Sequence, residues 1–245
     1  MDPHPSAPSD QPPRVSELRG YGVAVSDLEA LWPPSLKKKM KRDGLAAVMA
    51  RLGLIERLRF FWAFLAAKKR ANKLDLSEIR SRGMSNESFL DQQREFLAMY
   101  AALVEVAGRE RAMEINRALM DATAREPMLL VLPDPDEVRA AGDPFVVMRD
   151  YLRPMPEAGR KAGCQDITLR EGEEEFGFDV TRCVWLELAR QMGVPEATLG
   201  ACYSDEIAFP EYFRSLGMSY SRTGTLAGGA KCCDFRFKRA TQRSG

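Results

Sequence analysis

The sequence predicts an α+β fold, in which a helical N-terminal half is followed by a small mixed region that ends in a β-hairpin. Three observations predict this class. Apolar residues in the first half recur at helical spacing. From Phe176 to Thr181 the residues alternate with period two, which is typical of a strand. Near the C-terminus, Ala227-Gly228-Gly229-Ala230 separates two apolar runs and indicates a turn between antiparallel strands.

The chain is expected to hold one domain over residues 21–245, with a helical half at 21–160 and a cysteine-bearing half at 161–240. Residues 1–20 are expected to be a disordered tail, because this segment has five prolines and little to bury. The tail contains His4, which is the only histidine of the chain. A histidine base, a His–Cys dyad and a His-rich metal site are therefore not expected, and proton transfer falls to carboxylates, tyrosine, lysine, thiols or water.

Start and stop residues define the helices of the first half. Ser85 or Asn86, followed by Glu87, is expected to start a helix, which runs about five turns until Gly108 ends or bends it. A second helix continues from Arg109 to Ala124, and Pro127 stops it. Two later pairs, Asp134-Pro135 and Asp143-Pro144, each combine a cap with a first-turn proline and predict two short helices.

The elements of the second half come in a mixed order. Val184 to Met192 has helical spacing, and Pro210 to Leu216 predicts a further short helix. Strands are predicted from Met218 to Leu226 and from Lys231 to Lys238. The last strand places Cys233 and two phenylalanines on its core side, since side chains alternate across a strand.

A basic stretch with bulky apolar residues lies between Lys37 and Asp75, which contains twelve Lys and Arg residues and only three acidic residues. Its centre, residues 45–67, has helical spacing and an aromatic patch from Phe60 to Phe64. One interpretation is a pair of helices that pack this patch on the domain. The other is a peripheral membrane contact or a dimer face, because basic residues around bulky apolar ones suit both.

Composition narrows the function classes. The formal net charge of +1 gives no reason to expect nucleic-acid binding. Five cysteines and no secretory signal at the N-terminus predict reduced thiols and a cytoplasmic protein. Four of those cysteines lie in the last third of the chain, near the ends of predicted elements.

Two chemistries fit such a group of thiols. A thiolate can attack an electrophilic carbon when its pKa is lowered or a base lies beside it. Alternatively, several thiolates and a carboxylate can bind a soft metal such as zinc. The spacings between Cys183, Cys202 and Cys233 are not those of paired zinc ligands, so we expect no cofactor and keep zinc as the alternative.

The same region resembles a known family through a set of motifs in a fixed order. These are Phe178-x-Val180-Thr181-x-Cys183, Gly193-x-Pro195-Glu196, Cys202-x-x-Asp205, Arg222-x-x-Thr225-x-x-Gly228 and Cys233-Asp234-Phe235-x-Phe237. Together they resemble the L-2-amino-thiazoline-4-carboxylic acid hydrolase family over about a quarter of the chain. A fainter likeness, limited to a Cys-x-x-Asp and a later Cys-Cys, is to organomercurial lyases.

The resemblance implies a cysteine-dependent hydrolase that opens a small heterocyclic substrate, thiazoline-like, at a C–S or C–N bond. Carried over by position, it implies candidate thiols and acid or base groups at Cys183, Cys202, Cys233, Asp205 and Asp234. It also implies substrate-binding candidates at Arg222, Thr225 and Tyr203. Arg222 is chosen because its planar guanidinium suits a substrate carboxylate, and a cross-strand ion pair is its alternative.

Two alternatives to the hydrolase stay open. The same thiols suit a non-catalytic protein that binds or senses a small ligand or a metal. The same scaffold also suits a ring isomerase or lyase, because one fold hosts different chemistries.

Overall fold

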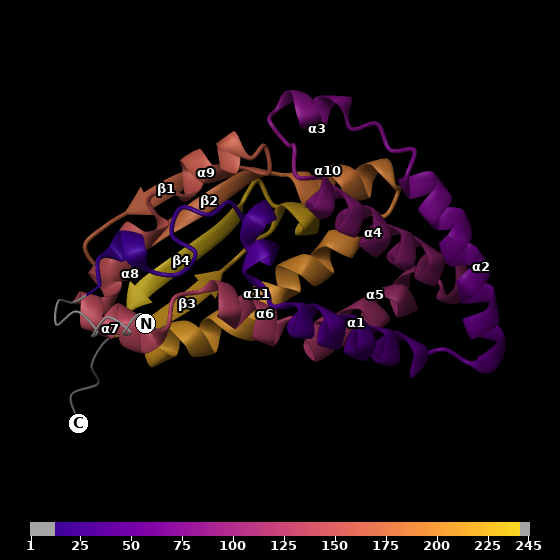
Figure 1. The fold of residues 1–245 in the computed structure, drawn as a ribbon, viewed down its shortest axis with the longest axis horizontal. Helices are drawn as coiled ribbons and strands as arrows, with labels where there is room; N and C mark the ends of the chain where they lie inside the picture. Colours follow the sequence, from indigo (N-terminus) through magenta and orange to yellow (C-terminus); the bar gives the residue numbers. More distant parts are fainter. Residues whose placement is uncertain (1–12, 241–245) are drawn as a thin grey trace, which may run out of the picture.

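The computed structural model describes residues 13–240, and it confirms the predicted α+β class (Figure 1). Helices dominate up to residue 161, and the four described strands all come after it. The α-helices are α1 (Pro34–Met49), α2 (Leu54–Ala71), α3 (Ser77–Ser81), α4 (Glu87–Ala107), α5 (Arg109–Thr123), α6 (Arg125–Val131), α7 (Pro135–Ala141), α8 (Pro144–Leu152), α9 (Met155–Lys161), α10 (Val184–Gln191) and α11 (Ala197–Ser215). The 3₁₀ helices are η1 (Val15–Glu17), η2 (Val25–Leu31) and η3 (Leu226–Gly228), and the strands are β1 (Gln165–Glu171), β2 (Glu175–Cys183), β3 (Met218–Arg222) and β4 (Cys233–Arg239).

The predicted helix caps are confirmed. The side chain of Asn86 accepts a hydrogen bond from the backbone N–H of Phe89 at the start of α4. Asp134 and Asp143 cap α7 and α8 in the same way, and each is followed by a proline in the first turn. Gly108 separates α4 from α5 with φ of +82°, a conformation that a residue with a side chain rarely adopts.

Two prolines behave differently from the prediction. Pro127 lies inside the first turn of α6, where a missing N–H costs nothing because no carbonyl partner exists there. Pro210 lies inside α11, so the short helix predicted from Pro210 is wrong and the helix begins at Ala197. Buried Tyr212 and Phe213 hold the turn after Pro210 against the core, which offsets the lost backbone hydrogen bond.

The N-terminal helices form one hydrophobic cluster. Helix α2 packs along α4, and α1 packs along α5. The buried side of α2 consists of Phe60, Ala63, Ala67 and Ala71, which lie three or four residues apart and so share one face. Small residues on this face let the axes of α2 and α4 approach closely.

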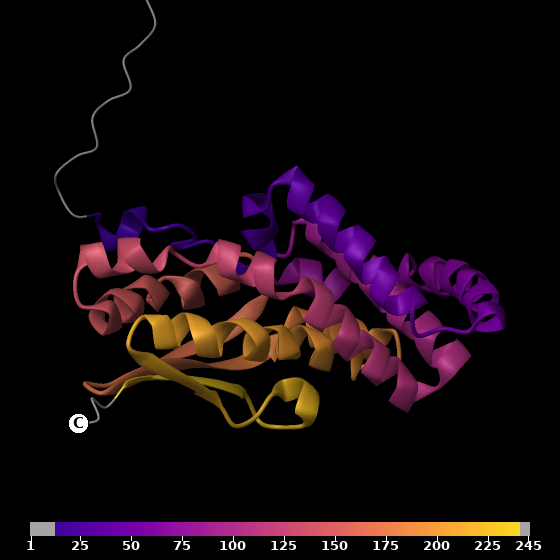
Figure 2. The ribbon, with the colours of Figure 1, turned by 90° about the horizontal axis from the view of Figure 1, so that it is seen from below.

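The four strands form an antiparallel sheet in the order β1-β2-β4-β3. One face of this sheet carries the aromatic residues of β2 and β4, and α8 and α11 cover it. Phe178 stacks on Phe235 with ring centroids 4.4 Å apart, and Phe237 lies 4.3 Å from Phe213 of α11. In Figure 2 the sheet forms the lower layer, with the main helices on one side of it.

The strands of the second half differ from the prediction in two places. Strand β1 was not predicted, because Ile167 and Leu169 are its only apolar residues and both are only half-buried at the sheet edge. The terminal strands β3 and β4 do pair, but β3 ends at Arg222 and β4 begins at Cys233. A longer loop that contains η3 therefore connects them, instead of a turn at residues 227–230.

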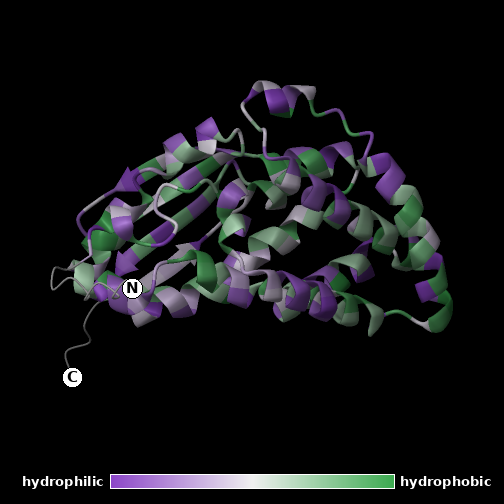
Figure 3. Ribbon diagram, viewed as in Figure 1, coloured by the Kyte–Doolittle hydropathy of each residue, from purple (hydrophilic) through white to green (hydrophobic). Residues whose placement is uncertain are grey.

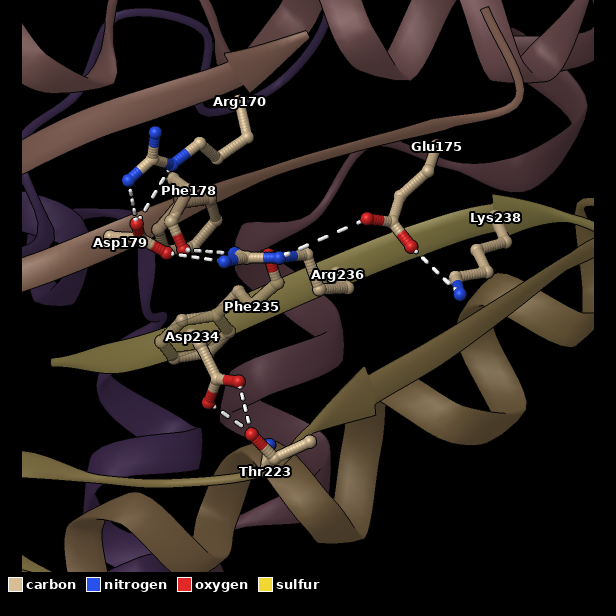
Figure 4. Close-up of polar contacts among 9 residues, drawn as sticks. All are labelled: Arg170, Glu175, Phe178, Asp179, Thr223, Asp234, Phe235, Arg236 and Lys238. Carbon is tan, nitrogen blue, oxygen red and sulfur yellow. Dashed lines mark hydrogen bonds and ion pairs between the residues drawn. The ribbon is translucent and has the colours of Figure 1, made fainter. Parts of the chain in front are cut away.

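The other face of the sheet is polar (Figure 4). Asp179 of β2 is buried there, and its two carboxylate oxygens accept hydrogen bonds from Arg170 of β1 and Arg236 of β4. Glu175 pairs with Lys238 at the end of the same strands. This charge pattern identifies the face as the solvent side, so the apolar face toward α11 is the one that can build a site.

The predicted tail at residues 1–20 is described only from residue 13, and His4 lies outside the described residues. From there the chain is packed, since Leu18 is buried and the hydroxyl of Tyr151 donates to the carbonyl of Arg19. Over the described residues, none of the helices has the length and apolar character to cross a bilayer.

Candidate functional site

A cavity of about 340 Å³ lies between the inner face of the sheet, α11, α8 and the η2 segment. Most of its lining is apolar, with aromatic residues from β2, β4 and α11. Five residues predicted as functional line this one cavity: Cys183, Cys202, Asp205, Arg222 and Cys233. An apolar cavity with a few converging polar groups is the usual form of a small-molecule site.

Helix α11 supplies one wall of the cavity. Thr198, Cys202, Asp205 and Phe209 line it, and they are spaced by four, three and four residues. This spacing places them on one helix face, so a single helix orients a thiol and a carboxylate into the same space.

The strand ends supply the opposite wall. Cys183 is the last residue of β2, Arg222 is the last residue of β3, and Cys233 is the first residue of β4. In the register of the sheet Val180 pairs with Cys233 and Arg222 pairs with Phe235. Antiparallel pairing therefore brings three residues that are up to 50 positions apart to the same end of the sheet.

Cys202 and Cys233 form a hydrogen-bonded thiol pair across the cavity. The hydrogen bond from Cys202, the N–H of Leu226 and the positive charge of Arg222 lower the pKa of Cys233 to about 7. The Leu226 nitrogen lies 3.2 Å from the Cys233 sulfur. The same hydrogen bond, burial and the Asp205 charge raise the pKa of Cys202. Because the N–H of Leu226 donates to the Cys233 sulfur, the thiolate is favoured on Cys233 and the proton on Cys202.

Asp205 and Arg222 form an ion pair beside the thiols. Nη1 of Arg222 donates to Oδ2 of Asp205 at 2.7 Å, and Nη2 donates to the carbonyl of Cys202 at 2.7 Å. Glu206 lies 2.8 Å from the same guanidinium. Burial raises the pKa of Asp205 to about 6, although the Arg222 charge opposes this shift. Asp205 is therefore poised to exchange a proton near neutral pH.

The other cysteines are placed differently. Cys183 lines the cavity, but burial raises its pKa to about 12, so it stays a neutral thiol. Cys164 is fully buried in the helical core, and burial raises its pKa as well. Cys232 precedes β4 and does not line the cavity.

Three predicted site residues do not line the cavity. Asp234 points to the polar face of β4, where it accepts hydrogen bonds from Thr223 and Gly224 (Figure 4). Thr225 caps η3 by accepting the N–H of Gly228. Tyr203 donates to Asp121 on the surface, 2.9 Å away. The predicted ion pair of Arg222 is present, but its partners come from α11 rather than from a neighbouring strand.

The sequence missed the residues that the helical half contributes. Trp32, at the end of η2, lines the cavity, and its indole N–H donates to the carbonyl of Pro127. Gln92 of α4 and Trp185 of α10 also line it. Thr198 was missed although it lies one helical turn before Cys202, and its buried hydroxyl finds no hydrogen-bond partner within residues 13–240. The sequence could have indicated Thr198 only through its position four residues before Cys202, which puts both on the same face of a helix.

In the part of the chain from residue 13 to 240, no three side chains among His, Cys, Asp and Glu are arranged to hold a metal ion. Zinc binding by the thiols of the cavity stays an alternative, which elemental analysis of the purified protein can test.

Comparison with known families agrees with this geometry. The model of the L-2-amino-thiazoline-4-carboxylic acid hydrolase family matches residues 88–237, which is more than half of the chain. The chain belongs to this family. The match starts near the beginning of α4, so the family region includes the helices behind the cavity as well as the motifs that carried the resemblance. Curated proteins gave no match, and neither did solved structures.

Membership of a family named for a hydrolase places this protein among enzymes at that level. All five of its cavity-lining candidates fall within the matched residues 88–237.

Proposed function

We propose that this member of the L-2-amino-thiazoline-4-carboxylic acid hydrolase family is a cysteine-dependent hydrolase that opens a small thiazoline-like ring at a C–S or C–N bond. The observation that carries the proposal is the Cys202–Cys233 pair, in which one sulfur has a lowered pKa inside a largely apolar cavity. A thiolate at neutral pH is the form that attacks carbon.

Cys233 is the proposed nucleophile. Its sulfur receives a backbone N–H from the η3 loop and the field of Arg222, and both favour the anion. Cys202 is the proposed hydrogen-bond donor that holds this anion. Because the Cys202 pKa is raised, it keeps its proton while Cys233 reacts.

The proposed reaction has two stages. The Cys233 thiolate adds to the ring carbon between sulfur and nitrogen, the ring bond breaks, and the leaving heteroatom takes a proton from Asp205. Water then adds to the carbon held on Cys233 while Asp205 takes the proton back, and the C–S bond to Cys233 breaks. The net change is the addition of one water, and no oxidant or reductant is needed. The Asp205 pKa of about 6 suits both directions of proton transfer.

Arg222 is proposed to act on two groups. It fixes the Asp205 carboxylate at 2.7 Å and lowers the Cys233 pKa through its charge. A substrate carboxylate can still approach it from the cavity, but that anion joins Asp205 and Glu206 around one guanidinium. We therefore propose the buried hydroxyl of Thr198 as a second group for polar atoms of the substrate.

The η3 loop holds this arrangement from behind. Asp234 accepts the backbone N–H groups of Thr223 and Gly224, directly after Arg222. Thr225 caps η3, and the N–H of the next residue, Leu226, reaches Cys233. Asp234 and Thr225 are therefore proposed as positioning residues. Tyr203 donates to Asp121 outside the cavity, so no part in the reaction is proposed for it.

The test is turnover of 2-amino-thiazoline-4-carboxylate, followed by mass spectrometry as the gain of one water. Cys233→Ser is expected to lose activity by at least about a thousandfold, because the hydroxyl is a far weaker nucleophile. Cys232→Ser is the matched control and is expected to keep activity, since Cys232 does not line the cavity. Full activity of Cys233→Ser would remove the thiol mechanism.

The same preparation separates the alternatives. No turnover by the wild-type protein, with one zinc per chain that Cys202→Ser and Cys233→Ser both release, would replace the hydrolase by metal-thiolate binding. A product with the mass of the substrate would replace it by a ring isomerase.

A further inference from the structure

Helix α2 has two apolar faces, and only one of them is used within the described chain. The inner face packs on α4, as described above. The outer face carries Leu54, Ile55, Leu58, Phe61, Trp62 and Leu65, whose exposed fractions lie between 44% and 75%. We call these six residues the α2 outer face. In Figure 3 hydrophobic residues run along α2 at the edge of the molecule, and Figure 1 places α2 at the end away from the sheet.

The six residues form one stripe. At about 100° per residue, they fall within roughly 60° on either side of Leu58, whereas buried Ala67 falls on the opposite side. Large aromatic and aliphatic side chains in one exposed stripe are unusual on a monomer surface and indicate a surface that is covered in function.

Basic side chains border the stripe. Arg57 and Lys68 lie along one edge, Arg59 lies along the other, and Lys69 lies at its C-terminal end. Among residues 13–240, Arg59, Lys68 and Lys69 have no carboxylate within ion-pair distance. Acidic residues nearby are already paired, since Glu56 binds Arg111 at 3.0 Å and Asp43 binds Arg42 at 2.8 Å. The outer face therefore presents an apolar centre with a net positive border.

This charge pattern favours one kind of binding partner for the α2 outer face over another. A second copy of the chain docked through the same face would bring two basic borders together, because an isologous contact meets its own surface. Like charges in contact oppose such a dimer. An anionic bilayer surface has the complementary charge and an apolar layer beneath it, where Trp and Phe are favoured and Lys and Arg extend to the headgroups.

We propose that the α2 outer face is a peripheral membrane-binding surface for anionic phospholipid. In this arrangement α2 lies in the plane of the interface with Phe61 and Trp62 in the acyl boundary and the basic border on the headgroups. The inner face stays on α4, so binding needs no unfolding of the helical cluster. The proposal does not depend on the thiol chemistry, because the α2 outer face contributes no residue to the cavity.

The test uses the full chain and vesicles of phosphatidylcholine, with or without phosphatidylglycerol, in a flotation assay. Binding is expected only with phosphatidylglycerol, and it is expected to weaken as salt is raised. The double variant Phe61→Ser with Trp62→Ser is expected to lose at least about tenfold in partitioning. Met113→Ser is its control, because Met113 is also exposed but lies on α5.

The charge border is tested separately. Arg59→Glu is expected to weaken binding to the anionic vesicles at least about fivefold, since each basic residue near the surface contributes roughly that factor. Arg214→Glu, at another exposed arginine, on α11, is expected to have no effect. Trp62 also serves as a reporter, because its fluorescence should shift to shorter wavelength with vesicles in the wild type and not in Trp62→Phe.

Three outcomes would overturn the proposal. One is that the wild type and the double variant bind equally well, and that each binds neutral vesicles as well as anionic ones. Another is no vesicle binding together with a dimer, by sedimentation velocity, that the double variant abolishes, which assigns the face to a second copy. The third is no vesicle binding and a monomer in both proteins, which leaves an acidic protein partner as the occupant. Thermal melts of each variant check that the fold is kept.

Discussion

The Cys202–Cys233 pair makes a direct prediction for the substitution Cys202→Ala. This change removes the hydrogen bond that stabilises the Cys233 thiolate and leaves the contacts from Leu226 and Arg222 in place. A hydrogen bond to a charged group contributes about 1.5–3 kcal/mol. Since one pKa unit corresponds to about 1.4 kcal/mol, the Cys233 pKa should rise by roughly one to two units.

The sign of the effect on reactivity follows from the shift. With a pKa of about 7, half of Cys233 is thiolate at pH 7. After a rise of one to two units, only about 1–10% is thiolate at that pH. Because the thiolate is the reactive form, the pH profile of alkylation moves to higher pH in the variant.

The assay is the rate of iodoacetamide alkylation at Cys233 against pH, with mass mapping to separate the five cysteines. Cys202→Ser is expected to shift the profile less than Cys202→Ala, because a hydroxyl also donates. Cys232→Ala is the matched control and should leave the profile unchanged, since that thiol does not line the cavity. An unshifted profile in Cys202→Ala would refute the thiol pair as the origin of the low pKa.

Further predictions concern the sheet that carries the site. Phe237→Ala removes a side chain that is 1% exposed and should lower the free energy of unfolding by about 3–5 kcal/mol in urea titration. Gly177→Ala should prevent soluble folding, because its Cβ would lie 2.0 Å from the carbonyl oxygen of Phe235, whereas Gly53→Ala meets only a side-chain oxygen at 3.5 Å and should be tolerated. For Asp179, two arginines overcome burial and hold the pKa below its ordinary value, so its stabilisation is present at neutral pH and is lost in acid. Wild type and Asp179→Asn should therefore differ in melting temperature at pH 7 and converge as the pH falls below about 4.

The sequence predicted correctly those helix boundaries that are set by interactions between neighbouring residues. Asn86, Asp134 and Asp143 cap helices because a short side chain oxygen reaches the free N–H groups of the first turn. Gly108 breaks a helix because it alone adopts φ of +82° without strain. These are interactions within a few residues, so the sequence contains all the information.

The elements that the sequence missed depend on distant partners. Strand β1 is held by its pairing with β2, and its own residues give only two apolar positions. Helix α11 continues through Pro210 because the core holds Tyr212 and Phe213 on its far side. Neither fact is visible in a window of local sequence.

The site divides in the same way. Alternation along β4 was enough to turn Cys233 inward and Asp234 outward, whereas the helix that places Cys202 and Asp205 on one face was not predicted. Only the tertiary structure decided that Cys233 and Cys202 meet, because an antiparallel sheet and a helix that covers it bring together residues 31 positions apart. Proton sharing between the two sulfurs then depends on Leu226 and Arg222, whose positions are set by the loop and strand beside them. The sequence shows which residues can carry a charge, but the pKa of each one depends on the groups that surround it in the folded structure.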